Sequence, residues 1–234
     1  MLLNVRTVTA AVLLAITPSI LEAQTVVPIQ EEPRHRLVYE TPEFRILDIE
    51  IAPGDTTLFH RHDAPIAYAY ISPTPVNAQL LGQSWGSATR DSDPVASIGE
   101  ILLDEMYAAT PVDHRVTNLG NVPFRLIAVL NRGAGQTTNG KESHGAAGPP
   151  ETEGRWFRGT HHTLARQSPW EWQAVSRPVV VVQVSSGSVA VEPGAGPTTE
   201  LQSPGDFVVL QVDTRAELRN LGERPVTLAI VEVR

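Results

Sequence analysis

Residues 54–62 read Gly-Asp-Thr-Thr-Leu-Phe-His-Arg-His and place His60 and His62 one residue apart. In a β-strand, alternate side chains lie on one face, so the two imidazoles would point the same way, about 7 Å apart along the strand. Two imidazoles arranged in this way can hold one divalent metal ion if a third ligand comes from elsewhere. His114, within TPVDHRVTN, is the candidate for that third ligand. The alternative is that His60 and His62 are half-exposed strand histidines that bind no metal.

The same residues resemble the two sequence motifs of the cupin family. Gly54, His60 and His62 fit the first motif, and His114 followed by Asn118 fits the end of the second. The resemblance implies a small jelly-roll β-barrel with a metal ion held inside it. It also implies a range of reactions: oxygen-dependent cleavage, isomerisation, lyase chemistry or plain ligand binding. Because one fold hosts many functions, the resemblance does not choose among them.

The sequence departs from the family pattern at the glutamate of the first motif, whose position falls on Ile66 or Ala67. This leaves three neutral imidazoles, a set that is similar to the three-histidine iron oxygenases of the wider cupin group. Neutral imidazoles suit Fe, Mn, Zn, Ni or Cu, so we expect one divalent transition metal without choosing its identity. With no anionic protein ligand, such an ion keeps its positive charge and favours an anionic substrate or hydroxide.

The second half of the chain repeats the first. The segment that starts at Phe44 lies without gaps over the one that starts at Phe157, 113 positions later. The tripeptide Asn-Leu-Gly at 118–120 occurs again at 220–222, 102 positions later. Internal repeats of this kind indicate a repeated architecture. In this alignment all three candidate ligands are lost, with His60 over Gln173, His62 over Val175 and His114 over Ala216.

Short alternating segments separated by Pro, Gly and Asp, almost without helical periodicity, predict an all-β chain. We expect two tandem cupin-type jelly-roll barrels at 25–131 and 155–234, the second a degenerate copy without metal ligands, joined by a Gly/Pro-rich linker at 132–154. Residues 26–39 are expected to form an extended lead-in, and His114 to lie in a turn.

Three aromatic residues are candidates for the lining of a pocket. Tyr68 and Tyr70 lie in the alternating segment 66–71 and could donate hydrogen bonds or act as acid or base. They face the barrel interior if Ile66 does and face outward if Ala67 does, and the sequence leaves both possibilities open. Trp85, in the loop 81–99, is expected either to cover the pocket or to plug one end of the barrel.

Composition excludes several classes of function. The chain has 234 residues, an apolar content of 41% and a formal net charge of −8, which disfavours nucleic acid as a partner. It contains no cysteine, which rules out disulfides, thiolate zinc sites and cysteine nucleophiles.

Residues 1–24 have the pattern of a secretory signal peptide. Arg6 precedes an apolar run from Val8 to Ile16, and small and polar residues follow near Ala23. We therefore expect a secreted or periplasmic protein, with an uncleaved membrane anchor as the alternative. No later segment is long and apolar enough to span a bilayer.

Two functions are compatible with these residues. The first is a metal-dependent enzyme of the cell envelope, oxygenase-like or isomerase-like, that acts on a small molecule with an anionic or chelating group. The second is a non-catalytic ligand-binding or structural cupin without metal. We favour the enzyme, because no serine, cysteine or paired-carboxylate constellation in the sequence competes with the histidine cluster. The oligomeric state is not predicted.

Overall fold

The computed structural model describes residues 25–87, 95–135, 150–172 and 177–234. The expected signal peptide, residues 1–24, lies outside the described residues. Regular structure consists of strands and two short 3-10 turns, η1 (Ile29–Glu31) and η2 (Met106–Ala108), so the prediction of an all-β chain is confirmed. No helix in the described ranges is long and apolar enough to cross a membrane.

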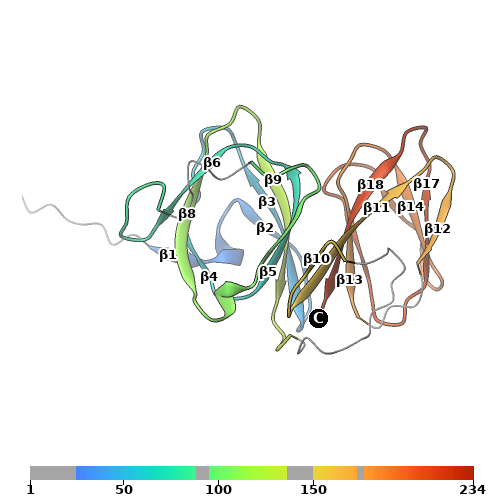
Figure 1. Ribbon diagram of the computed structural model, residues 1–234, viewed down its shortest axis with the longest axis horizontal. Helices are drawn as coiled ribbons and strands as arrows, with labels where there is room; N and C mark the ends of the chain where they lie inside the picture. Colours follow the sequence, from blue (N-terminus) through green and yellow to red (C-terminus); the bar gives the residue numbers. More distant parts are fainter. Residues whose placement is uncertain (1–24, 88–94, 136–149, 173–176) are drawn as a thin grey trace, which may run out of the picture.

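The first barrel has two sheets that face each other across its core (Figure 1). The sheet on the outer side of the molecule, here the first outer sheet, contains in order β1 (Val26–Pro28), β4 (Phe59–His62), β8 (Val112–Asn118) and β6 (Val76–Leu80). The first interface sheet, which faces the second barrel, contains in order β2 (His35–Glu40), β3 (Phe44–Ile51), β9 (Phe124–Asn131), β5 (Ile66–Ser72) and β7 (Ile101–Asp104).

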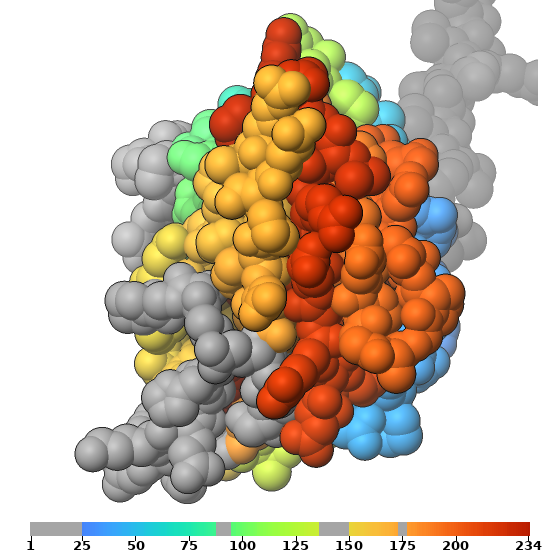
Figure 2. All heavy atoms as spheres, turned by 90° about the vertical axis from the view of Figure 1, so that its right-hand side faces the viewer, coloured from blue at the N-terminus to red at the C-terminus, as the bar shows by residue number. Residues whose placement is uncertain are grey.

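The second barrel repeats this arrangement, and its strands fill the face seen in Figure 2. Its interface sheet contains in order β10 (Thr152–Glu153), β11 (Phe157–Leu164), β18 (Val226–Val233), β13 (Val179–Gln183) and β16 (Phe207–Leu210). Its outer sheet contains in order β12 (Pro169–Trp172), β17 (Ala216–Asn220), β14 (Val189–Pro193) and β15 (Thr199–Leu201).

The two interface sheets pack against each other through a shared apolar cluster. Ala67, Ala69 and Ile71 of β5 meet Val180 and Val182 of β13 in this cluster. Both faces of these strands are therefore buried, one in a barrel core and one between the barrels. This explains why all five residues of β13 are buried and why its sequence is an uninterrupted apolar run rather than an alternating one.

Two asparagines form the same set of hydrogen bonds in the two barrels, which confirms the internal repeat. The carboxamide of Asn118 donates to two main-chain carbonyls and accepts from the N–H two residues later, and Asn220 does the same in the second barrel. The partners are Ile51, Val122 and Gly120 in the first barrel and Leu164, Arg224 and Gly222 in the second. These partners lie 113 or 102 positions apart, the two offsets found in the sequence.

Some expectations about the connecting segments need correction. Residues 26–39 are not an extended lead-in, because β1 pairs with β4 and β2 pairs with β3. This pairing gives hydrogen-bond partners to backbone N–H and C=O groups that would lack them in an unpaired segment. Within the expected linker, β10 pairs with β11 and so belongs to the second interface sheet, while residues 136–149 lie outside the described residues. His114 lies in strand β8 and not in a turn.

Candidate metal centre

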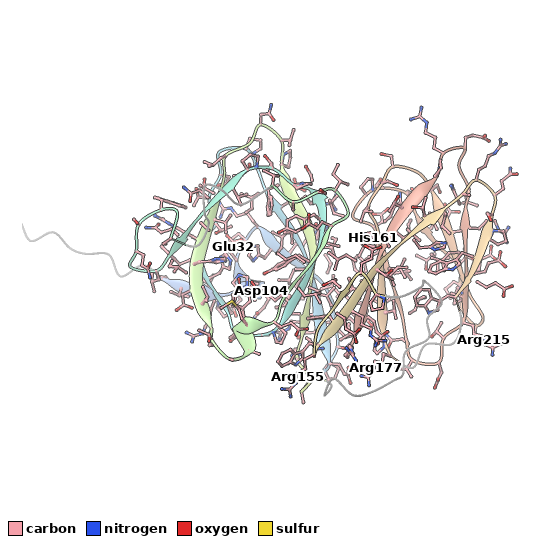
Figure 3. All side chains as sticks on the ribbon, in the orientation of Figure 1. Glu32, Asp104, Arg155, His161, Arg177 and Arg215 are labelled. Carbon is pink, nitrogen blue, oxygen red and sulfur yellow. The ribbon has the colours of Figure 1, made fainter. Side chains whose placement is uncertain are left out.

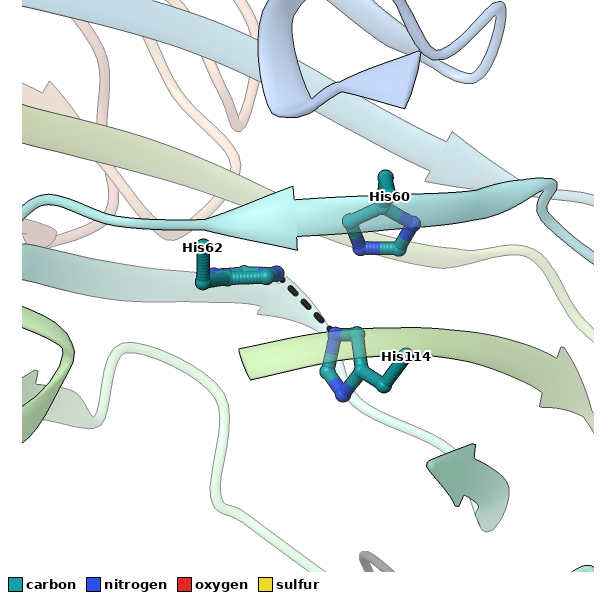
Figure 4. Close-up of side chains that lie close together, drawn as sticks. All are labelled: His60, His62 and His114. Atoms are coloured by element: carbon teal, nitrogen blue, oxygen red, sulfur yellow. Dashed lines mark hydrogen bonds between the residues drawn. The ribbon is translucent and has the colours of Figure 1, made fainter. Parts of the chain in front are cut away.

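Strand register brings the three predicted ligands together. His60 of β4 lies directly opposite His114 of β8, and His62 follows two residues later on the same face. The three rings point toward one another, as Figure 4 shows, with centroids 4.6–5.0 Å apart. Their candidate ligand atoms all lie within 4.8 Å of one another, and Nε2 of His114 is 3.0 Å from Nε2 of His62.

One hydrogen bond fixes the tautomer of His60 and leaves its Nε2 available to bind a metal ion. Nδ1 of His60 lies 3.0 Å from the carbonyl oxygen of Leu58, which can only accept, so Nδ1 carries the proton and donates it. The lone pair is then on Nε2, on the side of the ring away from that carbonyl. His60 is only 1% exposed, so water does not compete for this arrangement.

Burial keeps the three imidazoles neutral. Desolvation lowers the pKa of His60 to about 4 and that of His114 to about 3, and it lowers the pKa of His62 well below its usual value. A metal ion needs neutral imidazoles, because protonation removes the lone pair that binds it. The separation of Nε2 of His62 from Nε2 of His114 also fits, since two nitrogens that each lie about 2.1 Å from one ion are at most about 4.2 Å apart. The residues present therefore fit a divalent transition metal.

A fourth histidine and a buried carboxylate lie beside the cluster, and the sequence did not point to either. The ring of His35 lies edge-on to that of His60, with centroids 4.5 Å apart. Its Nδ1 is 3.0 Å from the carbonyl oxygen of Ile29, and burial lowers its pKa to about 3. Glu32, labelled inside the first barrel in Figure 3, is 1% exposed and accepts from the N–H of Leu58, the residue whose carbonyl orients His60.

The inward-facing residues of β5 settle the open question about the tyrosines. Ile66 packs in the core of the first barrel together with Tyr68 and Tyr70, so both phenols face inward. The Tyr68 hydroxyl lies 3.5 Å from Nδ1 of His62, and burial raises the Tyr68 pKa well above its usual value. The ring of Tyr70 instead packs against Phe124, and burial raises its pKa to about 12.

Trp85 neither covers nor plugs the site. The guanidinium carbon of Arg115 lies over the Trp85 ring, 4.7 Å from the centroid of that ring. Arg115 follows His114 in β8, so its side chain leaves the opposite face of the strand, outside the barrel. The indole is 40% exposed there, which corrects the expectation of a pocket residue.

Tyr107 and Asp104 are further residues that the sequence did not single out. The Tyr107 ring, on η2, lies 4.7 Å from that of His62, and burial, followed by the charge of the nearby Asp104 carboxylate, raises the pKa of Tyr107. Asp104 pairs in register with Ile66, which faces the barrel core, so both side chains lie on that face. Ile66 is one of the two positions where the family motif would carry its glutamate. A carboxylate from the neighbouring strand thus lies beside that position, although it is not within the histidine ligand set.

The second barrel holds a tryptophan where the first holds a ligand. Trp172 of β12 lies opposite Ala216 of β17, the pairing that corresponds to His60 and His114. The gapless alignment that placed Gln173 over His60 is therefore one residue out of step at this strand. Gln173 and Val175 themselves lie outside the described residues. Trp172 is 4% exposed and fills the space with an indole, which is not a metal ligand.

No protein-family model and no curated protein matches the sequence. Similar solved structures include AerE from Microcystis aeruginosa, with 10% identity over 87% of this chain and 98% of that chain and a TM-score of 0.58. Salicylate 1,2-dioxygenase from Pseudoaminobacter salicylatoxidans, solved as adducts with gentisate, has 14% identity over 83% of this chain and 69% of that chain and a TM-score of 0.54. A cupin 2 conserved barrel domain protein from Leptotrichia buccalis has 10% identity over 85% and 87% and a TM-score of 0.49.

At these identities the comparisons establish the fold. The paired jelly-roll sheets, their repetition within one chain and the histidine motifs agree with them. The chain therefore has the fold of the cupin superfamily, in its two-barrel form.

Proposed function

We propose that this chain is a metal-dependent enzyme that acts on a small molecule, with His60, His62 and His114 holding one divalent transition metal. The observation that carries the proposal is the register of β4 and β8, which sets His60 opposite His114 and leaves Nε2 of His62 3.0 Å from Nε2 of His114. Three neutral imidazoles that converge on one point, two of them buried and His114 half-buried, form a metal site more readily than a packed core, because apolar side chains would fill that space at lower cost.

The chain's own residues hold and orient the ligands and exclude water from them. The main chain at Leu58 fixes the tautomer of His60, and Tyr68 faces the outer nitrogen of His62. A bound metal ion would act as a Lewis acid toward an oxygen of the substrate. The ligand set consists of three neutral imidazoles, with Glu32 and Asp104 outside it, so the ion itself would attract an anionic or chelating group.

Oxygenase-like chemistry has one further support. Salicylate 1,2-dioxygenase, which shares the fold, was solved with gentisate bound. Isomerase-like chemistry would use the same three ligands and an inward-facing tyrosine such as Tyr68 as a hydrogen-bond donor, since burial keeps its phenol protonated. We further propose that residues 1–24 direct export to the cell envelope, which the mass of the mature protein from its native host would test.

Metal analysis tests the proposal directly. Protein purified from its native compartment should carry close to one equivalent of a transition metal, and His62→Ala should lose it. His162→Ala is the matched control, because His162 stacks on Trp170 in the second barrel, away from the cluster. Wild-type protein that is free of metal and whose stability ignores EDTA would leave a non-catalytic ligand-binding or structural cupin instead.

A further inference from the structure

The segment before the first interface sheet brings a buried carboxylate next to the histidine centre. β1 pairs in parallel with β4, and Val27 lies opposite His60 in that ladder. The short turn η1 follows, and Glu32, the residue after it, is 1% exposed. Figure 3 labels Glu32 inside the first barrel. A carboxylate in such a place is costly unless other groups hydrogen bond to it, so its partners indicate its role.

The carboxylate of Glu32 accepts hydrogen bonds from two main-chain groups. The N–H of Arg34 donates to Oε2 at 2.6 Å, and the N–H of Leu58 donates to Oε1 at 3.1 Å. Nη1 of Arg34 also lies 3.3 Å from Oε1, and the same guanidinium donates to Asp55. Hydrogen bonds from main-chain N–H groups to a carboxylate are roughly twice as strong as bonds between neutral groups. Glu32 therefore fixes the main chain at Leu58 relative to the residues that precede β2.

Leu58 in turn orients one of the predicted metal ligands. Its carbonyl oxygen accepts the Nδ1 proton of His60 at 3.0 Å, which leaves the lone pair on Nε2. The side chain of Leu58 is 45% exposed, so its own packing constrains the main chain little. The same residue thus donates to Glu32 through its N–H and accepts from His60 through its C=O. A displacement of Leu58 would change the direction in which the His60 ring points.

We propose that Glu32 is a positioning residue of the histidine centre. Through the main chain of Leu58 it holds the His60 ring in the tautomer with the proton on Nδ1 and with Nε2 directed at the cluster. Glu32 does not bind the ion itself, because the candidate ligand group consists of the three histidines. It therefore supports the ligands from outside and does not replace the missing glutamate of the family motif. This inference rests on the proposed function.

The metal-free protein tests the connection from Glu32 to His60. NMR of the EDTA-treated full chain follows the exchange of the His60 Nδ1 proton with solvent. In Glu32→Gln this exchange should be about ten-fold faster than in wild type, the value of one hydrogen bond. The reason is that only one of the two terminal atoms of a glutamine side chain accepts, so the two main-chain donors cannot both keep their partner.

Titration with Co²⁺ tests the effect on the metal site. The visible spectrum of the ion reports binding to the full chain. Glu32→Gln should bind Co²⁺ about ten-fold more weakly than wild type, because His60 is no longer held with Nε2 in one direction.

Two further variants complete the test. Asp206→Asn is the matched control, because the Asp206 carboxylate also accepts from two main-chain N–H groups, those of Gln202 and Ser203, but in the second barrel. It should keep the wild-type exchange rate and affinity. Glu32→Asp keeps the negative charge but withdraws the carboxylate from the Leu58 N–H by one methylene. It should change both measurements in the same direction as Glu32→Gln, and it carries the test if Glu32→Gln does not fold.

The outcomes separate the two proposals. Unchanged exchange and unchanged Co²⁺ affinity in the folded Glu32 variants overturn the positioning role and leave the metal site standing. A change in only one of the two measurements also overturns it, because the effect would then bypass His60 or have no consequence for the metal. Equal changes in Asp206→Asn overturn it as well, since they would reflect a general loss of structure. Wild-type protein that takes up no Co²⁺ refutes the proposed function itself, while the exchange of the His60 proton still tests the connection to Glu32.

Discussion

Acidification of the metal-free protein should destabilise it strongly, and the size of the effect follows from the buried imidazoles. A histidine in the unfolded chain has a pKa of about 6.5, whereas those of His60, His114 and His35 lie at about 4, 3 and 3 in the folded protein. Between these values the unfolded chain binds more protons, so stability is lost as the pH falls below about 6.5. From pH 7.5 to pH 5, each imidazole contributes a loss of about 2 kcal/mol, and the three together about 6 kcal/mol.

This loss approaches the whole stability of an ordinary domain, which is about 5–15 kcal/mol. The value is insensitive to the folded pKa, because any value well below 5 leaves the imidazole neutral at pH 5. Burial is the largest cause of the lowered pKa in all three histidines, so the predicted loss of stability arises from the barrel interior. The carboxyl groups of Asp48 and Asp55 have lowered pKa values through their arginine partners and stay ionised at pH 5.

Urea titrations of the EDTA-treated protein at pH 7.5 and pH 5 measure the difference in the free energy of unfolding. A variant with His35, His60 and His114 replaced by glutamine is the control, and it should lose far less on acidification. A wild-type loss below about 1 kcal/mol would refute the reasoning, since it would mean that these rings already accept protons in the folded state.

Three other outcomes are expected. Asn118→Ala and Asn220→Ala should each lower the free energy of unfolding in urea titrations by about 3 kcal/mol, because each deletes three hydrogen bonds and leaves buried main-chain groups without a partner. A cost below about 1 kcal/mol for either variant would contradict the paired roles. Tyr68→Phe should weaken metal binding about ten-fold by removing the partner of His62 Nδ1, with an unchanged circular dichroism spectrum, and unaltered affinity would exclude that role. EDTA should lower the melting temperature of the metal-loaded wild type but not of His62→Ala, and equal shifts would place the metal elsewhere.

The sequence predicted the part of the site that depends on local geometry. Two histidines one residue apart share a face of any strand, whatever lies around them, so His60 and His62 could be paired from spacing alone. His114 was found through the motif, although its strand was mistaken for a turn. The register that sets it opposite His60 is a property of two segments more than fifty residues apart, which spacing does not reveal.

Two of the residues that sequence reasoning missed, His35 and Asp104, reach the site through long-range strand pairing. His35 arrives because β2 joins the edge of the first interface sheet, and Asp104 because β7 pairs with β5. Neither stands in a motif, and each is an ordinary polar residue in its own segment. Asp104 does match Asp206 at the 102-residue offset of the repeat, but such a match concerns architecture and not chemistry.

The second barrel has the same fold as the first but lacks the histidines of the candidate metal site. Asn220 preserves the bonds that close one end of the barrel, and the valines of β13 preserve the packing between barrels. Trp172 and Ala216 replace a facing pair of histidines by a large and a small side chain, which together fill the interior without a ligand. At this position the second barrel needs side chains of the right volume to fill its interior, whereas the first barrel needs side chains whose lone pairs point to one place. The facing pair His60 and His114 is thus replaced as a pair in the second barrel, by Trp172 and Ala216.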